Sequence, residues 1–337
     1  MNQVREQMPD NLRRFDDPWG ITWRLKNAVR RMNLRKFWRY QTARSKAPRH
    51  KRPIFVLGAP RSGTSMLFRL LSAHPELGSL GREGHDMWRK FHHPRQDGWG
   101  SDAVGSGQIT TREREFIRRY LYMHFDQARF VEKTPENCLR LAYLQELYPD
   151  ALYVFVRRDP REVMSSMLNG WRHPMGRFRS YFVPEKLEIP GYSQPHQWCF
   201  TLIGNWRDYK SQPLPRVVAE QWRQTIHGAL TGRQLIGSEQ WIELSLQAFT
   251  TDPCKEMRVL LDKLGLSTND KILDLANENS VVNAMVESTP GSWQLNASEL
   301  AGMLPLVKDE IEACGYNYES LLEETRAAAD AVASGGQ

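Results

Sequence analysis

The segment 58–65, Gly-Ala-Pro-Arg-Ser-Gly-Thr-Ser, has the composition of a site for a phosphate or a similar anion. Gly58 and Gly63 allow a tight turn whose backbone N–H groups point inward, and a following helix would add the positive end of its dipole. Further donors come from the hydroxyl groups of Ser62, Thr64 and Ser65. The spacing is that of a Walker A loop, but Thr64 stands where the lysine would be. Arg61 is the cation inside the loop, and an arginine can clamp a phosphate without a metal ion.

Arg158 and Ser166 form a second candidate anion site. Arg158 follows a predicted buried strand at 151–156, and Ser166 lies two helical turns further on. Because ligands of open α/β sheets bind beyond the carboxyl ends of the strands, both residues are expected at the ligand edge. A kinase of this class would close that strand with an acidic residue that holds Mg²⁺, and this strand ends in two arginines instead. Two phosphate sites without a metal-ligand pattern suit a nucleotide that carries phosphate at both ends of its ribose.

Strand, anion loop and helix therefore occur in succession, and this order predicts the fold. Ile54–Leu57 is a short β-branched and aromatic run, typical of a buried parallel strand. Pro160 suits the first turn of a helix, with Asp159 as its N-cap. Further helices are expected at 216–235, 253–265 and 301–314, and a further strand at 241–244. The pattern predicts an α/β protein with a P-loop-type three-layer αβα fold around a central, mostly parallel sheet.

Composition limits the class of protein. The chain has 337 residues, 40% of them hydrophobic, and lacks the run of about 18 apolar residues that a transmembrane helix needs. No apolar segment near the start resembles a secretory signal. The four cysteines are far apart, which argues against a zinc site or a disulfide framework and suits the cytoplasm. We divide the chain into an arm (1–52), an α/β domain (53–325) with an acceptor-side insertion (171–215), and a flexible tail (326–337).

The arm carries a net charge of +11, and the remainder of the chain carries −4. Leu25, Val29 and Met32 recur at helical spacing among basic residues, which predicts an amphipathic helix. Such a helix either packs its apolar face on the domain or lies on an anionic membrane surface as a peripheral contact. Nucleic acid is not expected as a partner, because the basic excess stops at Arg52 and no recognition motif follows.

Taken together, these motifs resemble the sulfotransferases that use 3′-phosphoadenosine 5′-phosphosulfate (PAPS). The loop PRSGTS is similar to the family's 5′-phosphosulfate loop, and RDPREVMSSM is similar to its 3′-phosphate motif. Three further segments resemble the broad bacterial branch of the family: Gly84–Trp88, VEKTPEN (131–137) and Leu-Gly-Leu (264–266). The resemblance extends more distantly to the tyrosylprotein-type enzymes. The chain departs from the cytosolic aryl and steroid branch, because Arg61 replaces a lysine and Val286-Glu287-Ser288 replaces a basic triplet.

The resemblance implies roles for individual residues. Glu83 would be the general base, as in tyrosylprotein-type enzymes, with His85 as the alternative. Lys133 would stabilise the oxygen that bridges phosphorus and sulfur, and Arg61 would be an electrophilic clamp. PAPS would be held by Arg61, Ser62, Gly63, Thr64, Ser65, Arg158 and Ser166. The adenine contact is not assigned, and Trp222 is one candidate for it.

Several functions are compatible with this reading. The first is a PAPS-dependent sulfotransferase that needs no metal and acts on a hydroxyl of a carbohydrate, lipid or other small molecule. The second is a P-loop phosphotransferase or kinase, which would need a lysine and Mg²⁺ ligands that the motifs lack. The third is a non-catalytic protein that binds a nucleotide or a membrane, with the arm as its working part. We expect a cytoplasmic location, with membrane association if the arm binds lipid.

Overall fold

The computed structural model describes residues 38, 41–42, 50–174, 176, 178–278 and 291–334. Five parallel strands form the central sheet in the order β2-β3-β1-β4-β7. They are β1 (Ile54–Leu57), β2 (Leu77–Gly78), β3 (Arg129–Glu132), β4 (Leu152–Arg157) and β7 (Trp241–Ser245). A separate antiparallel pair consists of β5 (Arg179–Phe182) and β6 (Gln197–Cys199).

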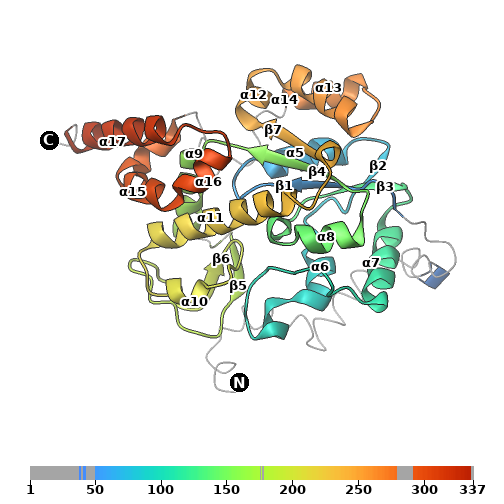
Figure 1. The fold of residues 1–337 in the computed structure, drawn as a ribbon, viewed down its shortest axis with the longest axis horizontal. Helices are drawn as coiled ribbons and strands as arrows, with labels where there is room; N and C mark the ends of the chain where they lie inside the picture. Colours follow the sequence, from blue (N-terminus) through green and yellow to red (C-terminus); the bar gives the residue numbers. More distant parts are fainter. Residues whose placement is uncertain are drawn as a thin grey trace.

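Helices connect and cover these strands (Figure 1). The α-helices are α5 (Thr64–Ser72), α6 (His85–His92), α7 (Thr111–His124), α8 (Leu141–Leu147), α9 (Pro160–Arg172), α10 (Trp206–Tyr209), α11 (Leu214–Arg233), α12 (Leu246–Thr251), α13 (Pro253–Leu264), α14 (Asp270–Glu278), α15 (Ala297–Met303), α16 (Lys308–Ala313) and α17 (Tyr318–Ser334). The 3₁₀ turns are η1 (Pro94–Asp97), η2 (Pro135–Leu139), η3 (Ser238–Gln240), η4 (Ser292–Asn296) and η5 (Leu304–Val307).

Side-chain alternation along the strands divides the core into two layers. In β1, Ile54 and Val56 face the helices α5, α12, α13 and α14, whereas Phe55 and Leu57 face α6, α7, α8 and α11. Both faces of the sheet are thus covered, which explains why the strands are apolar throughout rather than alternating with polar residues. Figure 1 shows α12 to α14 on one side of the sheet and α6, α8 and α11 on the other. The predicted three-layer αβα fold is confirmed.

Parallel pairing brings the segments that follow the strands to one edge of the sheet. Leu57 pairs with Phe155 and Phe55 with Glu132, so that β1, β3 and β4 all end at this edge. The loop 58–63 therefore emerges between the segments that begin at Lys133 and Arg158. This is the edge at which ligands of open α/β sheets bind.

Residues beyond both predicted bounds of the α/β domain contact its core. The ring of His50, in the predicted arm, is buried against Phe125 and Phe130, with ring centroids 5.6 and 5.2 Å apart. At the other end, α17 continues through residues 326–334, which we assigned to a flexible tail. Alanines favour the helix, and Ala328 and Ala329 pack on the core. The amphipathic helix predicted within the arm lies outside the described residues.

The insertion 171–215 contributes more to the core than its loop-rich composition indicates. Trp171, Trp198 and Trp206 are at most 1% exposed and contact one another edge to face, with ring centroids 5.2 and 5.9 Å apart. The contact of this insertion with an acceptor stays a prediction. Among the described residues, no helix has both the length and the apolar character to span a membrane.

Candidate active site

The loop after β1 has the backbone that the glycines were expected to allow. Gly58 and Gly63 adopt φ angles of 150° and 93°, and Gly63 is the N-cap of α5. The hydroxyl of Ser62 donates to the Ala59 carbonyl oxygen at 2.7 Å, which closes the turn. The first N–H groups of α5 have no preceding helical carbonyl to donate to, so they are available to an anion at the helix start.

Gly63 has no room for a side chain. A Cβ built there would lie 2.8 Å from the Leu246 side chain, at a φ that L-residues avoid. We expect Gly63→Ala to lower the free energy of unfolding by about 1–3 kcal/mol, from backbone strain and the close contact. Thermal denaturation measures this. Gly302→Ala in α15 is the control, because nothing lies within 4 Å of its Cβ position. Equal melting temperatures for the Gly63 variant and the unchanged protein would contradict the view that this position requires glycine.

Arg158 and Ser166 both contact Arg61 of the loop. Arg61 Nε donates to Ser166 Oγ at 3.1 Å, and Arg158 Nη1 donates to the carbonyl oxygen of Arg61 at 2.9 Å. Burial lowers the pKa of Arg158, although the Glu162 carboxylate 3.3 Å away opposes this effect. Arg61 thus contacts Ser166 through its guanidinium group and Arg158 through its backbone carbonyl. We call these three residues, Arg61, Arg158 and Ser166, the second anion site.

Arg61 contacts Ser166 and the insertion, and its role as an electrophilic clamp stays a prediction. Its φ of 76° is unusual for a residue with a side chain. Its guanidinium carbon lies 4.8 Å from the ring centroid of Phe178, a cation–π contact with the insertion. These contacts place Arg61 at the second anion site. Sequence reasoning missed Phe178 because no pattern relates an insertion residue to the loop.

Glu83 and Lys133 meet at the start of α5. Lys133 Nζ donates to Ser65 Oγ at 2.9 Å and forms an ion pair with Glu83 Oε1. His85 Nε2 lies 2.7 Å from Glu83 Oε2. Burial alone would raise the pKa of Glu83, but the hydrogen bond from His85 and the charge of Lys133 outweigh it and lower the pKa to about 2. Glu83 is therefore ionised, and Lys133 links it directly to the anion loop.

The segment after β3 holds the loop that carries Glu83. The Gly84 N–H donates to Glu132 Oε1 and to Thr134 Oγ1, both at 3.0 Å. Asn137 Nδ2 donates to the second oxygen of Glu132 at 2.5 Å. Glu132 is 1% exposed, and burial raises its pKa. The predicted VEKTPEN motif is therefore a scaffold for the Glu83 loop as well as the source of Lys133.

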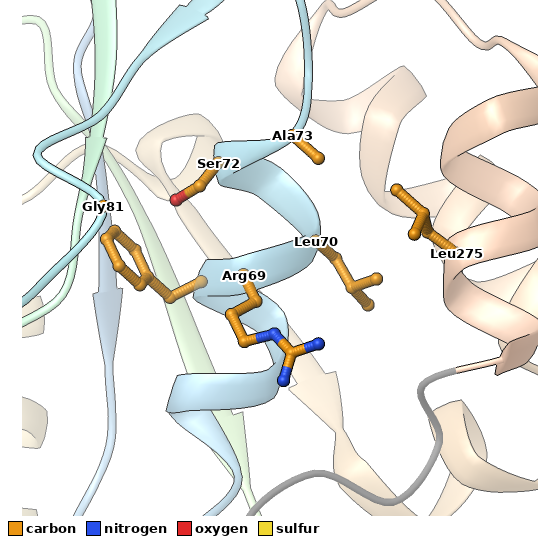
Figure 2. Close-up of a pocket in the computed structure, with 7 residues that line it drawn as sticks. Arg69, Leu70, Ser72, Ala73, Gly81 and Leu275 are labelled. Atoms are coloured by element: carbon orange, nitrogen blue, oxygen red, sulfur yellow. The ribbon is translucent and has the colours of Figure 1, made fainter.

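Trp222 is 2% exposed and lines a small pocket together with Ser62 and Arg158, so its contact with an adenine stays a prediction. A hollow of about 320 Å³ lies between α5 and α14, where Leu70 and Leu275 line it together with Arg69 (Figure 2). It includes none of the predicted site residues. Within the described part of the chain, no group of three or more His, Cys, Asp or Glu side chains is placed to hold a metal ion.

The fold and the anion loop define an α/β protein of the three-layer αβα class. The family model described as "Sulfotransferase family" matches residues 53–197, a range that contains every predicted site residue. The predicted resemblance to the sulfotransferase family is thus confirmed over this range.

Known proteins are also similar to this chain. A putative protein-tyrosine sulfotransferase of Caenorhabditis briggsae is 34% identical over 121 residues, which is 34% of this chain and 42% of that protein. Protein-tyrosine sulfotransferase A of Caenorhabditis elegans is 23% identical over 234 residues, 65% of this chain and 51% of that protein. The chain spans about half the length of these curated relatives. Sulfotransferase STF9 from Mycobacterium avium shares the fold, with a TM-score of 0.53 and 16% identity over 84% of this chain and 82% of that one.

Proposed function

We propose that this protein is an enzyme that transfers a sulfuryl group from PAPS to a hydroxyl acceptor, with Glu83 as the general base. The contact of Lys133 with both Ser65 and Glu83 carries the proposal. The Lys133 ammonium group therefore lies between the loop suited to the donor's phosphate and Glu83, the only carboxylate that Lys133 contacts in the described structure.

The residues at the sheet edge fit the two ends of PAPS. The N-terminal N–H groups of α5 and the hydroxyls of Thr64 and Ser65 suit the 5′-phosphosulfate. The second anion site suits the 3′-phosphate, because guanidinium groups bind phosphate through paired hydrogen bonds. Bound PAPS would supply an activated sulfuryl group whose leaving group is a phosphate.

Each side chain then has a definite task. The ionised Glu83 takes the proton of the acceptor hydroxyl. Lys133 offsets the negative charge that develops on the leaving phosphate oxygen. The sulfuryl acceptor is a hydroxyl of a carbohydrate, a lipid or another small molecule. A phenolic tyrosine side chain joins these candidates, since relatives bear the name protein-tyrosine sulfotransferase.

A screen of hydroxyl compounds with ³⁵S-labelled PAPS tests the proposal, with one carbohydrate, one lipid alcohol, 4-nitrophenol and one tyrosine peptide as minimal arms. Labelled product in any arm supports transfer. Calorimetry with adenosine 3′,5′-bisphosphate tests the nucleotide site separately. Turnover with ATP and Mg²⁺, without turnover with PAPS, would favour the phosphotransferase alternative.

We expect PAPS-dependent transfer to persist in excess EDTA. The positive charges proposed to meet the donor belong to Arg61, Lys133 and Arg158, so no metal has to supply them. Initial rates with and without chelator measure this, and they should agree within about twofold, since no stabilising charge is lost. A loss of activity that added Mg²⁺ restores would overturn the metal-free mechanism.

A further inference from the structure

We propose that His85, backed by Glu136, is a positioning residue that fixes the Glu83 carboxylate so that its Oε1 atom takes the acceptor's proton. The inference rests on the proposed function and assigns a role to a residue that we considered only as an alternative base. Its basis is a continuous line of contacts from Glu83 into the protein interior.

His85 occupies one of the two Glu83 oxygens. Its Nε2 lies 2.7 Å from Oε2, while Lys133 contacts Oε1. An ionised carboxylate can only accept, so the imidazole nitrogen is the donor. His85 is the first residue of α6, so its short side chain stays close to that helix, whereas the buried Lys133 ammonium ends a four-carbon chain with rotatable bonds. Of the two contacts, the one from His85 is therefore suited to persist during the reaction.

Glu136 stands on the other side of the ring. Its Oε1 lies 3.4 Å from His85 Nδ1, and its side chain is 3% exposed. Burial alone would raise the pKa of Glu136, but the charges of His85, Arg89 and Arg140 outweigh it and lower the pKa to about 2. Glu136 Oε1 and His85 Nδ1 form an ion-pair contact rather than a hydrogen bond, so Glu136 acts on the ring through its negative charge. The imidazole of His85 thus lies between the carboxylates of Glu83 and Glu136.

The position of Glu136 is itself fixed. Arg89 Nη2 donates to Glu136 Oε1 at 2.6 Å and also to the hydroxyl of Tyr181 at 2.6 Å. Tyr181 in turn donates to the buried Asp102, which pairs with Arg140 at 3.3 Å. Within this network Glu136 pairs with Arg89 and Asp102 pairs with Arg140, so each buried carboxyl group has an arginine partner. A rigid support of this kind is what a precisely oriented base needs.

The transfer step then balances as follows. The acceptor O–H bond breaks, its proton bonds to Glu83 Oε1, and the acceptor oxygen forms a bond to sulfur. The bond between sulfur and the phosphate oxygen breaks, and its electron pair stays on that oxygen. Lys133 leaves Oε1 to offset this charge, which frees Oε1 for the proton. His85 keeps its N–H on Oε2 throughout, so the carboxylate does not rotate when Lys133 departs.

Removal of the His85 side chain should raise the pKa of Glu83. The groups that face the Glu83 side chain or its loop are His85, Lys133, Ser65 and Arg82, with Glu136 and Arg89 behind the ring. The hydrogen bond and charge of His85 lower the pKa of Glu83. Without them this pKa rises, so Glu83 becomes protonated at a higher pH and the acidic limb of the transfer rate moves to higher pH.

The test compares His85→Ala with His85→Gln, since glutamine keeps an N–H donor near the position of Nε2. The first readout needs no turnover: ¹³C NMR follows the Glu83 carboxyl carbon with pH, identified as the signal that Glu83→Gln removes. The second is transfer from PAPS to 4-nitrophenol and to water. We expect His85→Ala to raise the Glu83 pKa and lower kcat about 10- to 100-fold, with little change in bisphosphate affinity. His85→Gln should restore most of the lowered Glu83 pKa and most of kcat.

The Glu83 pKa and the kcat of Glu136→Gln should lie between those of the unchanged protein and those of His85→Ala. His227→Ala, at an exposed histidine, is the matched control. An unshifted Glu83 pKa in His85→Ala, or equal losses in the Ala and Gln variants, would overturn the positioning role. If the unchanged protein neither binds adenosine 3′,5′-bisphosphate nor releases sulfuryl from PAPS, the proposed function fails instead. The two failures are therefore distinguishable.

Discussion

Glu83→Gln is expected to abolish sulfuryl transfer while the protein binds adenosine 3′,5′-bisphosphate almost as tightly as before. A positioned base contributes roughly 10²–10⁴-fold to such a reaction, so we expect a loss of about 10³-fold in kcat. The glutamine oxygen still accepts a hydrogen bond from Lys133, so this buried cation keeps a partner. Glu83 is linked to the loop through Lys133, and the glutamine keeps that contact, which is why nucleotide affinity should survive.

Initial rates with labelled PAPS and calorimetry with the bisphosphate measure the two properties separately. Glu188→Gln, an exposed carboxylate in the insertion, is the matched control and should behave as the unchanged protein. Equal losses of rate and affinity in Glu83→Gln would show that the residue supports the nucleotide site rather than the chemistry.

Arg158→Ala should weaken PAPS about 100-fold and its 3′-dephosphorylated analogue, adenosine 5′-phosphosulfate, far less. A hydrogen bond to a charged group contributes about 1.5–3 kcal/mol, and Arg158 would offer two donors to the 3′-phosphate. The affinity ratio of the two nucleotides isolates the contribution of Arg158 to binding of the 3′-phosphate, because any general damage to the loop weakens both nucleotides.

Arg157→Ala provides the control for this ratio. Arg157 is the last residue of β4 and directly precedes Arg158, but its guanidinium donates to the Cys314 carbonyl at 2.7 Å and pairs with Glu243. It should leave the ratio unchanged even if it lowers stability. If Arg158→Ala weakened both nucleotides equally, the assignment of the 3′-phosphate to this arginine would be wrong.

The sheet could be predicted because local pattern determines it. Apolar runs such as Ile54–Leu57, followed by glycine and a helical period, permit few alternatives to a buried parallel strand. The helix expected at 301–314 is divided in the structure into α15, η5 and α16. Pro305 explains this break, because proline removes a backbone donor and crowds the preceding turn.

The site was predictable only in part. The loop, Arg158 and Ser166 follow from their positions after two strands, and the role of Glu83 came from the family resemblance. The direction of the Arg61 side chain depends on its positive φ, which the sequence does not encode at a residue that is not glycine. The contact of His85 with Glu136 joins residues 51 positions apart. No periodicity reports such a contact, since the packing of α6 on η2 creates it.

A crystal structure with adenosine 3′,5′-bisphosphate tests most directly how the donor nucleotide is held. It should show the 5′-phosphate on the N–H groups at the start of α5, the 3′-phosphate between Arg158 and Ser166, and Glu83 facing the side from which sulfur would depart. Density for the nucleotide at any other place, or a magnesium ion between Arg61 and Arg158, would contradict the account.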